Sequence, residues 1–292
     1  MRLGTRGSAL ARTQSGHVAA AITAATGVAV ELVIFTTRGD RIVDRPLPEI
    51  GGKGLFTAEL EEALTSGDID LAVHSFKDMP TDSPRGLVFG AVPPRVDPSD
   101  VLVGATLDGL APGAVVGTGS VRRRLQLQAL RPDLVIRGIR GNVDSRIEKV
   151  RRGEYQAIVL AAAGVERLGR GAEIAQRLGV EQMVPAPAQG ALAVQCRAGD
   201  ARTLALLARI HDPATAACVA AERAFLEALS GGCNAPAAAL AQLDGDSLTL
   251  DGYLAANPDD PTSGRRLRLR SDVLHAVPLG RAMAQQLAAG AP

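Results

Sequence analysis

Residues 114–153 read AVVGTGSVRRRLQLQALRPDLVIRGIRGNVDSRIEKVRRG. Two short runs rich in β-branched residues, at 114–119 and 134–140, are each followed by a run of helical composition. The alternation continues outward, with further strand-like runs at 28–37, 68–76 and 157–161. Short strands that alternate with longer helices predict α/β architecture around largely parallel sheets.

Two breaks rich in proline and glycine, at 91–100 and 184–190, divide this pattern. We expect two doubly wound α/β domains around a cleft, an architecture like that of periplasmic binding proteins, followed by a small α+β domain. The expected bounds are 1–93 with 191–208 for domain 1, 96–186 for domain 2 and 211–292 for domain 3. The run at 191–197 after the second break could return to the sheet of domain 1.

Composition excludes several classes of partner. The 292 residues are 46% hydrophobic with a formal net charge of +1, so no strong overall field favours nucleic acid or an anionic membrane. Cys196, Cys218 and Cys233 lack the spacing of a zinc site or a disulfide framework, and we expect no metal. The absence of a leader peptide and of a long apolar run favours a cytoplasmic protein that does not bind membranes.

The run HSFKDMP, residues 74–80, places two opposite charges after an expected strand. Lys77 and Asp78 follow the last alternating residues, and Pro80 closes the strand. Ligands of open α/β sheets collect beyond the carboxyl ends of the strands, so this position favours a functional role. An ordinary surface ion pair is the alternative.

The run VVGTGSVRRRL, residues 115–125, predicts an anion site at a helix start. Gly119 permits a tight turn and Ser120 can cap the helix. Arg122 and Arg123 then lie at the positive end of the helix dipole, where a cation is disfavoured by about 0.3 to 1 kcal/mol. An anionic ligand would reverse this penalty, whereas a solvated basic face is the alternative.

Two further strand ends repeat the arrangement. Arg140 ends one strand and Arg146 lies in the first turns of the next helix, which suggests a ligand with several carboxylates or phosphates. At the N-terminus, Arg6 ends another strand, Ser8 lies near a helix cap, and Gln14 follows about two turns later.

The connection at 38–54 is long, polar and rich in glycine and proline, which makes it a candidate lid. Its GGKGLF run lacks the glycine spacing and the Ser or Thr of a phosphate-binding loop, so nucleotide binding by that motif is not expected.

Cys233 differs from the other two cysteines, which are expected in the core. Gly231 and Gly232 precede it and offer no side chains to pack around the sulfur, so the thiol should project from a loop. An exposed inert thiol is the alternative to a reactive one.

Together these motifs resemble the porphobilinogen deaminases, also called hydroxymethylbilane synthases. The resemblance covers essentially the whole chain up to the glycine–cysteine loop, and it is carried in order by GTRGS, HSFKDMP, GTGSVRRR, RGNVDSR, AAAGVERLG, PAQGALAVQCR and SGGCNAP. It implies an enzyme that condenses four porphobilinogen molecules, with loss of ammonia, into the linear tetrapyrrole hydroxymethylbilane. The product would pass to a downstream enzyme that cyclises it, and the enzyme is expected to be a monomer.

The resemblance also implies roles for individual residues. Cys233 would hold a dipyrromethane cofactor through a thioether, and Asp78 would be the catalytic carboxylate. The cofactor would also be bound by Ser75, Lys77, Asp78, Gly119, Ser120, Arg122, Arg123 and Arg146. Substrate would be bound by Arg6, Ser8, Gln14, Arg140, Arg167 and Gln189. Lys53 and Phe56 would belong to the lid.

The chain departs from the family pattern at two positions. Gly119 stands where the family usually has Ser, and Ser145 replaces a more usual Thr. The first change removes a hydroxyl that could bind a carboxylate, and the last domain looks short.

Two other functions are compatible with parts of the sequence. A non-catalytic two-domain protein that binds an anionic small molecule would account for the arginines but not for Cys233. A nucleic-acid binder could use Arg122 to Arg124, but the near-neutral charge and the 2% aromatic content argue against it.

Overall fold

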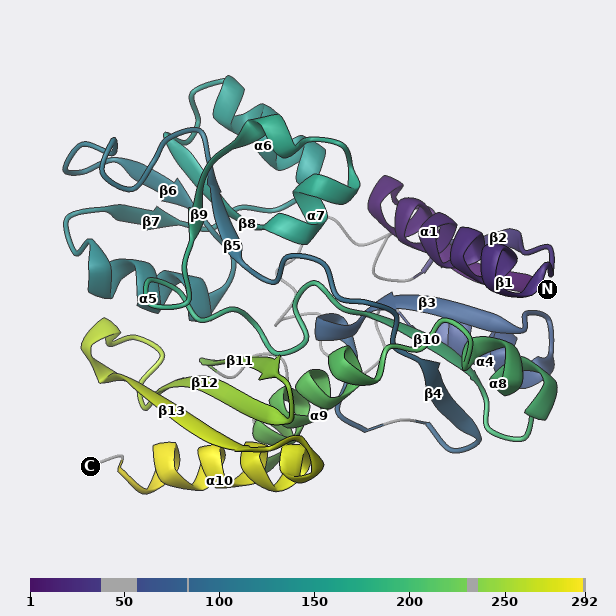
Figure 1. Cartoon of the computed structure of the whole chain (residues 1–292). Helices are drawn as coiled ribbons and strands as arrows, with labels where there is room; N and C mark the ends of the chain where they lie inside the picture. Colours follow the sequence, from purple (N-terminus) through teal and green to yellow (C-terminus); the bar gives the residue numbers. More distant parts are fainter. Residues whose placement is uncertain (38–56, 83, 230–235, 291–292) are drawn as a thin grey trace. The chain divides into compact units, whose positions relative to one another are not determined.

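The computed structural model describes residues 1–37, 57–82, 84–229 and 236–290 (Figure 1). The chain forms two compact units, Met1–Pro94 with Ala191–Thr215 and Arg95–Gly190 with Ala216–Pro292. It therefore crosses from one unit to the other three times. The loop 38–54 with Lys53, and also Phe56 and Cys233, lie outside the described residues.

Unit 1 is built on a five-stranded sheet with the order β2-β1-β3-β10-β4. Its strands are β1 (Arg2–Arg6), β2 (Glu31–Phe35), β3 (Leu71–Ser75), β4 (Leu87–Ala91) and β10 (Leu192–Arg197). Its helices include α1 (Ala9–Thr26), α4 (Ala58–Ser66) and α8 (Ala201–Leu207), and the 3-10 turn η1 (Phe76–Asp78) follows β3.

Strand direction in this sheet is mostly uniform. Strand β1 is parallel to β2 and β3, whereas β10 is antiparallel to both β3 and β4. Four strands therefore run one way and β10 runs the other, which confirms the largely parallel sheet predicted from the sequence. The run at 191–197 does form a strand of the first sheet.

Helices cover both faces of the sheet of unit 1. Val18 and Ile22 of α1 are buried with Leu3 and Leu71 against one face. Leu60 and Leu64 of α4 are buried with Ile69 and Ala72 against the other. A side chain at Gly4 would collide with Leu60 and Ile69, so glycine is needed where α4 packs closely on β1.

Unit 2 contains a second five-stranded sheet, with the order β7-β6-β8-β5-β9. Strand β6 is parallel to β7 and β8, and β5 is antiparallel to β8 and β9, so the pattern repeats that of unit 1. Its strands are β5 (Asp100–Val103), β6 (Val115–Gly117), β7 (Val135–Arg137), β8 (Ala157–Ala161) and β9 (Ile174–Leu178). The helices are α5 (Val121–Leu130), α6 (Val143–Arg151) and α7 (Ala162–Arg167), with the 3-10 turn η2 (Gly171–Glu173).

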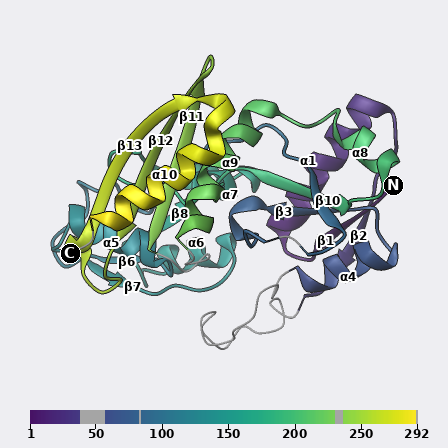
Figure 2. The same ribbon diagram turned by 90° about the horizontal axis from the view of Figure 1, so that it is seen from below.

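The C-terminal part of unit 2 is a three-stranded antiparallel sheet with two helices. Helix α10 lies along this sheet in both views (Figures 1 and 2), and Met283 of α10 is buried with Phe225 and Leu250 in their common core. The elements are α9 (Pro213–Ala228), β11 (Ala237–Asp244), β12 (Ser247–Ala255), η4 (Pro261–Ser263), β13 (Gly264–Asp272), η5 (Val273–His275) and α10 (Ala276–Ala289).

These elements confirm the predicted fold class of two α/β sheets followed by a small α+β part. The division of unit 2 into separate domains at 96–186 and 211–292 stays a prediction. In the part of the chain that the structure describes, no helix is long and apolar enough to cross a membrane.

Candidate active site

The carboxyl ends of β1 and β3 meet at one edge of the sheet in unit 1, because the two strands are parallel. Arg6 ends β1 and Ser75 ends β3. The charge of Arg6 acts on the neighbouring side chain of His74. Two of the predicted site residues are thus brought to the same edge.

The turn η1 continues directly from β3 and carries Lys77 and Asp78. Phe76 is buried and packs edge-on against Phe89 with 4.8 Å between ring centroids. Met79 is also buried, so an apolar anchor lies on each side of the two charged residues. Asp78 is exposed and Lys77 is half-buried, as expected of side chains that present a charge to a ligand.

Helix α1 supports this edge with two polar side chains. The buried amide of Gln14 donates from Nε2 to Ser75 Oγ at 2.9 Å. Ser8 caps the helix, and its Oγ accepts from the N–H of Ala11 at 3.3 Å. The predicted residues Gln14 and Ser75 are therefore in direct contact, and the position of the Ser75 hydroxyl is set by α1.

His74 is a buried neutral residue behind this edge. Its side chain is only 7% exposed, and Nε2 lies 3.1 Å from Gln195 Oε1. Burial lowers the pKa of His74 to about 4; the hydrogen bond to Gln195 raises it, and the charge of Arg6 lowers it further. His74 therefore has a packing role behind the edge.

The edge of unit 2 is built the same way. Strands β6 and β7 are parallel, with Gly117 opposite Arg137, so the helices that follow them start side by side at one edge. Ser120 caps α5, and its Oγ accepts from the N–H of Arg123 at 3.5 Å. Asn142 precedes α6 at the neighbouring strand end.

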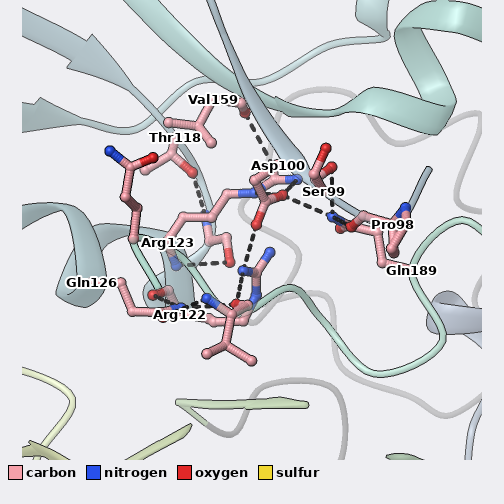
Figure 3. Close-up of polar contacts among 12 residues, drawn as sticks. Pro98, Ser99, Asp100, Thr118, Arg122, Arg123, Gln126, Val159 and Gln189 are labelled. Carbon is pink, nitrogen blue, oxygen red and sulfur yellow. Dashed lines mark hydrogen bonds and ion pairs between the residues drawn. The ribbon is translucent and has the colours of Figure 1, made fainter. Parts of the chain in front are cut away.

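A buried carboxylate that the sequence analysis missed lies at this edge (Figure 3). Asp100 Oδ2 accepts from Arg122 Nη1 at 2.6 Å, and Asp100 Oδ1 accepts from Arg123 Nε at 2.9 Å and Nη2 at 2.7 Å. Burial raises the pKa of Asp100, but the charges of Arg122 and Arg123 more than offset this, so the net pKa lies below its ordinary value. Two cations therefore share one anion.

Arg122 keeps donors for further partners. Arg122 is 6% exposed. Its Nη1 donates both to Asp100 and to the carbonyl of Val184, the latter at 2.8 Å. Its Nε and Nη2 have no partner among residues 1–37, 57–82, 84–229 and 236–290. A buried guanidinium with unused donors is a position where a ligand carboxylate can bind.

Two further buried arginines lie in unit 2, and the charge of one of them, Arg146, acts on that of Arg123. Burial lowers the pKa of Arg146 to about 10, and the charges of Arg123 and Arg140 contribute to the shift. Burial likewise lowers the pKa of Arg167 to about 10, and its Nη2 donates to the carbonyl of Gly190 at 2.8 Å. This arrangement favours an anion with more than one carboxylate.

Gln189, which was predicted to bind substrate, contacts Asp100. Its side chain is completely buried, and Nε2 donates to Asp100 Oδ1 at 2.9 Å and to the carbonyls of Pro98 and Ser99 at 2.7 and 3.2 Å (Figure 3). The three acceptors all belong to unit 2. The amide of Gln189 therefore fixes the carboxylate of Asp100, which in turn binds the two arginines.

The remaining cysteines fit their predicted place. Cys196 and Cys218 are both buried. No group of three or more potential metal ligands is found in the described part of the chain.

Comparison with known proteins identifies the family of this chain. Residues 1–205 match the family model for the porphobilinogen deaminase dipyromethane cofactor binding domain, and residues 216–289 match the porphobilinogen deaminase C-terminal domain. The chain belongs to the porphobilinogen deaminase family.

Individual members of the porphobilinogen deaminase family match over most of their length. The porphobilinogen deaminase of Roseiflexus castenholzii is 48% identical over 98% of this chain and 95% of its own. That of Stenotrophomonas maltophilia is 51% identical over 92% of this chain and 88% of its own. Among solved structures, the methionine-binding protein MetQ is 14% identical with a TM-score of 0.44, over 72% of this chain and 89% of that one.

Proposed function

We propose that the chain condenses four porphobilinogen molecules head to tail, with release of ammonia, into hydroxymethylbilane on a covalently bound dipyrromethane. The observation that carries this proposal is the porphobilinogen deaminase match, which extends over 1–205 and 216–289. The two α/β units supply complementary chemistry, a carboxylate at the strand edge of one and an arginine cluster at that of the other.

The arginine cluster fits the cofactor. Each pyrrole of a dipyrromethane bears an acetate and a propionate, so the group is a polyacid. Arg122 offers two unused donor nitrogens, and the lowered pKa of Arg146 is a consequence of burial and of neighbouring cations that an anion would compensate. Bidentate guanidinium–carboxylate pairing suits such a ligand.

We assign the attachment to Cys233 and most of the remaining contacts to side chains at the two edges. When bound, the dipyrromethane supplies the pyrrole end from which the chain is extended. The cofactor would be held by Ser75, Lys77, Asp78, Gly119, Ser120, Arg122, Arg123 and Arg146. Incoming substrate would be held by Arg6, Ser8, Gln14, Arg140 and Arg167, with Lys53 and Phe56 in the lid loop 38–54.

Asp78 is proposed as the catalytic carboxylate. The C–N bond of the protonated aminomethyl group of porphobilinogen breaks, nitrogen leaves with the electron pair as ammonia, and an azafulvene cation remains. At about 4 Å and an effective dielectric near 20, an ionised carboxylate stabilises such a cation by about 4 kcal/mol, which is roughly a thousandfold in rate. The exposure of Asp78 on η1 supports this role, and Gln14 keeps Ser75 in place beside it.

The intact mass of the purified protein tests the proposal. We expect the mass of a dipyrromethane above that of the chain, and discrete one-ring increments after porphobilinogen is added. Cys233→Ala should show neither the added mass nor activity, whereas Cys218→Ala, at a buried thiol of α9, should show both. A Cys233→Ala protein that still carries the mass would reject the attachment site.

We also propose a cytoplasmic monomer whose product is taken up by a cyclising enzyme. The free, buried thiol of Cys196 supports a reducing compartment. Light scattering on the purified protein would test the monomer, and a dimer mass would reject it.

A further inference from the structure

The arginine pair is held by a residue that has no assigned part in the chemistry. Asp100 is the first residue of β5, and it lies opposite Ala161, the last residue of β8, because the two strands are antiparallel. The reversed direction of β5 therefore puts a carboxylate at the same edge as the helix starts that carry the arginines. Asp100 is fully buried.

The contacts of Asp100 fix the orientation of both guanidinium groups. Arg123 presents Nε and Nη2 to one oxygen, and its Nη1 donates to the carbonyl of Val159 at 3.1 Å. Arg122 presents a single nitrogen to the other oxygen. An arginine side chain loses conformational entropy when it is ordered by a ligand. If the side chain is already ordered in the free protein, ligand binding does not carry this entropic cost.

We infer that Asp100 is a positioning residue for the condensation: it holds Arg122 and Arg123 in the orientation in which they receive pyrrole carboxylates, and Gln189 holds Asp100 in turn. This inference rests on the proposed function, in which the two arginines bind the cofactor. It also assigns Gln189 to the support of the arginines in place of direct contact with substrate, since its amide is buried and directed at Asp100.

The support continues beyond Gln189. Its backbone carbonyl accepts from Arg95 Nε at 2.7 Å, and Arg95 is paired with the buried Glu222. A continuous series of polar contacts thus runs from the arginine pair to the residue that follows the first crossing of the chain between units. The position of the pair is therefore set by the framework of unit 2 and not by α5 alone.

Three variants of the full-length protein test the inference. Asp100→Asn keeps the shape of the side chain but removes its charge, and Arg122→Gln removes one of the arginines. Asp97→Asn is the matched control. Asp97 lies three residues before Asp100 and also pairs with an arginine, Arg177, but this ion pair is partly exposed to solvent. For each folded variant we would measure the fraction that carries the dipyrromethane mass and the solvent exchange of arginine Nε–H groups by NMR.

We expect Arg122→Gln and Asp100→Asn each to reduce cofactor occupancy at least tenfold, and Asp97→Asn to leave it unchanged. The Nε–H of Arg123 should exchange slowly in the parent and in Asp97→Asn, and at least tenfold faster in Asp100→Asn. A merely structural role of Asp100 would lower the yield of folded protein without changing either quantity in the folded fraction.

The outcomes separate the inference from the proposed function. If Arg122→Gln keeps full occupancy, the carboxylate-binding role of the arginine fails. If Arg122→Gln loses the cofactor while Asp100→Asn keeps both occupancy and slow exchange, the positioning role is overturned and the function stands. Should Asp100→Asn fail to fold, Gln189→Met provides the test, with an expected threefold loss of occupancy and faster Arg123 exchange; parent values for both would overturn the inference.

Discussion

Arg95 and Glu222 form a bidentate ion pair inside unit 2, with 2.6 Å between Nη1 and Oε1 and 3.1 Å between Nη2 and Oε2. Glu222 also accepts from the backbone N–H groups of Ala188, at 2.5 Å, and Ala241, at 2.8 Å. One carboxylate thus joins three segments that are distant in sequence. Its side chain is 0% exposed, so none of its charge is solvated by water.

Glu222→Gln should destabilise the protein strongly. Removal of one partner from a buried ion pair leaves the other charge without compensation, and we expect the free energy of unfolding to fall by about 3 to 5 kcal/mol. Urea denaturation would measure it. Glu181→Gln is the control, because Glu181 pairs with Arg268 but is 79% exposed, and its loss should be about 1 kcal/mol or less. Equal losses in the two variants would contradict the prediction.

Asp78→Asn should yield a folded protein that retains its cofactor but turns over at least about a hundredfold more slowly, since a neutral amide stabilises a cation far less than a carboxylate. Single-turnover rates with porphobilinogen would measure the effect. Asp68→Asn changes an exposed carboxylate that precedes the same strand at its other end, and it should keep the parent rate. Near-normal turnover by the Asp78 variant would reject Asp78 as the charge stabiliser.

His74 should make the stability depend on pH. Its pKa of about 4 in the folded protein lies below the ordinary 6.5, so the unfolded chain binds the proton first as the pH falls. This contribution is fully present above pH 6.5 and is lost towards pH 4, by about 3 kcal/mol in total. His74→Gln should abolish this part of the pH dependence in unfolding experiments, whereas His17→Gln, at an exposed position of α1, should retain it. Identical pH profiles for the parent and the His74 variant would contradict the assignment.

Gly119→Ser should be tolerated. A Cβ at this position would lie 3.3 Å from the carbonyl oxygen of Ile139, a close contact that small shifts relieve, and the new hydroxyl can donate to a carboxylate. We expect urea denaturation to show a change of about 1 kcal/mol or less in the free energy of unfolding, and intact mass to show at least the parent's cofactor occupancy.

Gly117 in the same motif provides the comparison for Gly119. A Cβ there would lie 2.9 Å from both Ile158 and Tyr155 in the packed core, so Gly117→Ala should cost about 1 to 3 kcal/mol. If the two substitutions destabilise the protein equally, the distinction drawn between the two glycines is wrong.

Most strands of the two five-stranded sheets could be predicted, because they are short apolar runs separated by helices. The segments that became β1, β2, β3, β6, β7, β8 and β10 all carry this signal. Strands β4, β5, β9 and β13 were not predicted. Strand β13 reads GRRLRLRSD, in which arginines alternate with leucines, and its strong charge hides a clear period of two that marks a half-exposed strand.

The arginines of the candidate site could be predicted, but their anionic partner could not. Arg122 and Arg123 follow a glycine turn and a helix cap, which are local signals. Asp100 joins them only because β5 runs antiparallel to β8, and strand direction depends on the order in which the chain crosses between units.

The strand order of the two sheets has a consequence for synthesis. Strand β10 lies between β3 and β4, so the first sheet has a gap in its middle until residue 197 has left the ribosome. The second α/β sheet is complete once residue 178 has emerged, since β5 to β9 are contiguous in the chain. The later-made half can therefore assemble first, while the N-terminal half waits for its fifth strand and depends on protection from aggregation in the meantime.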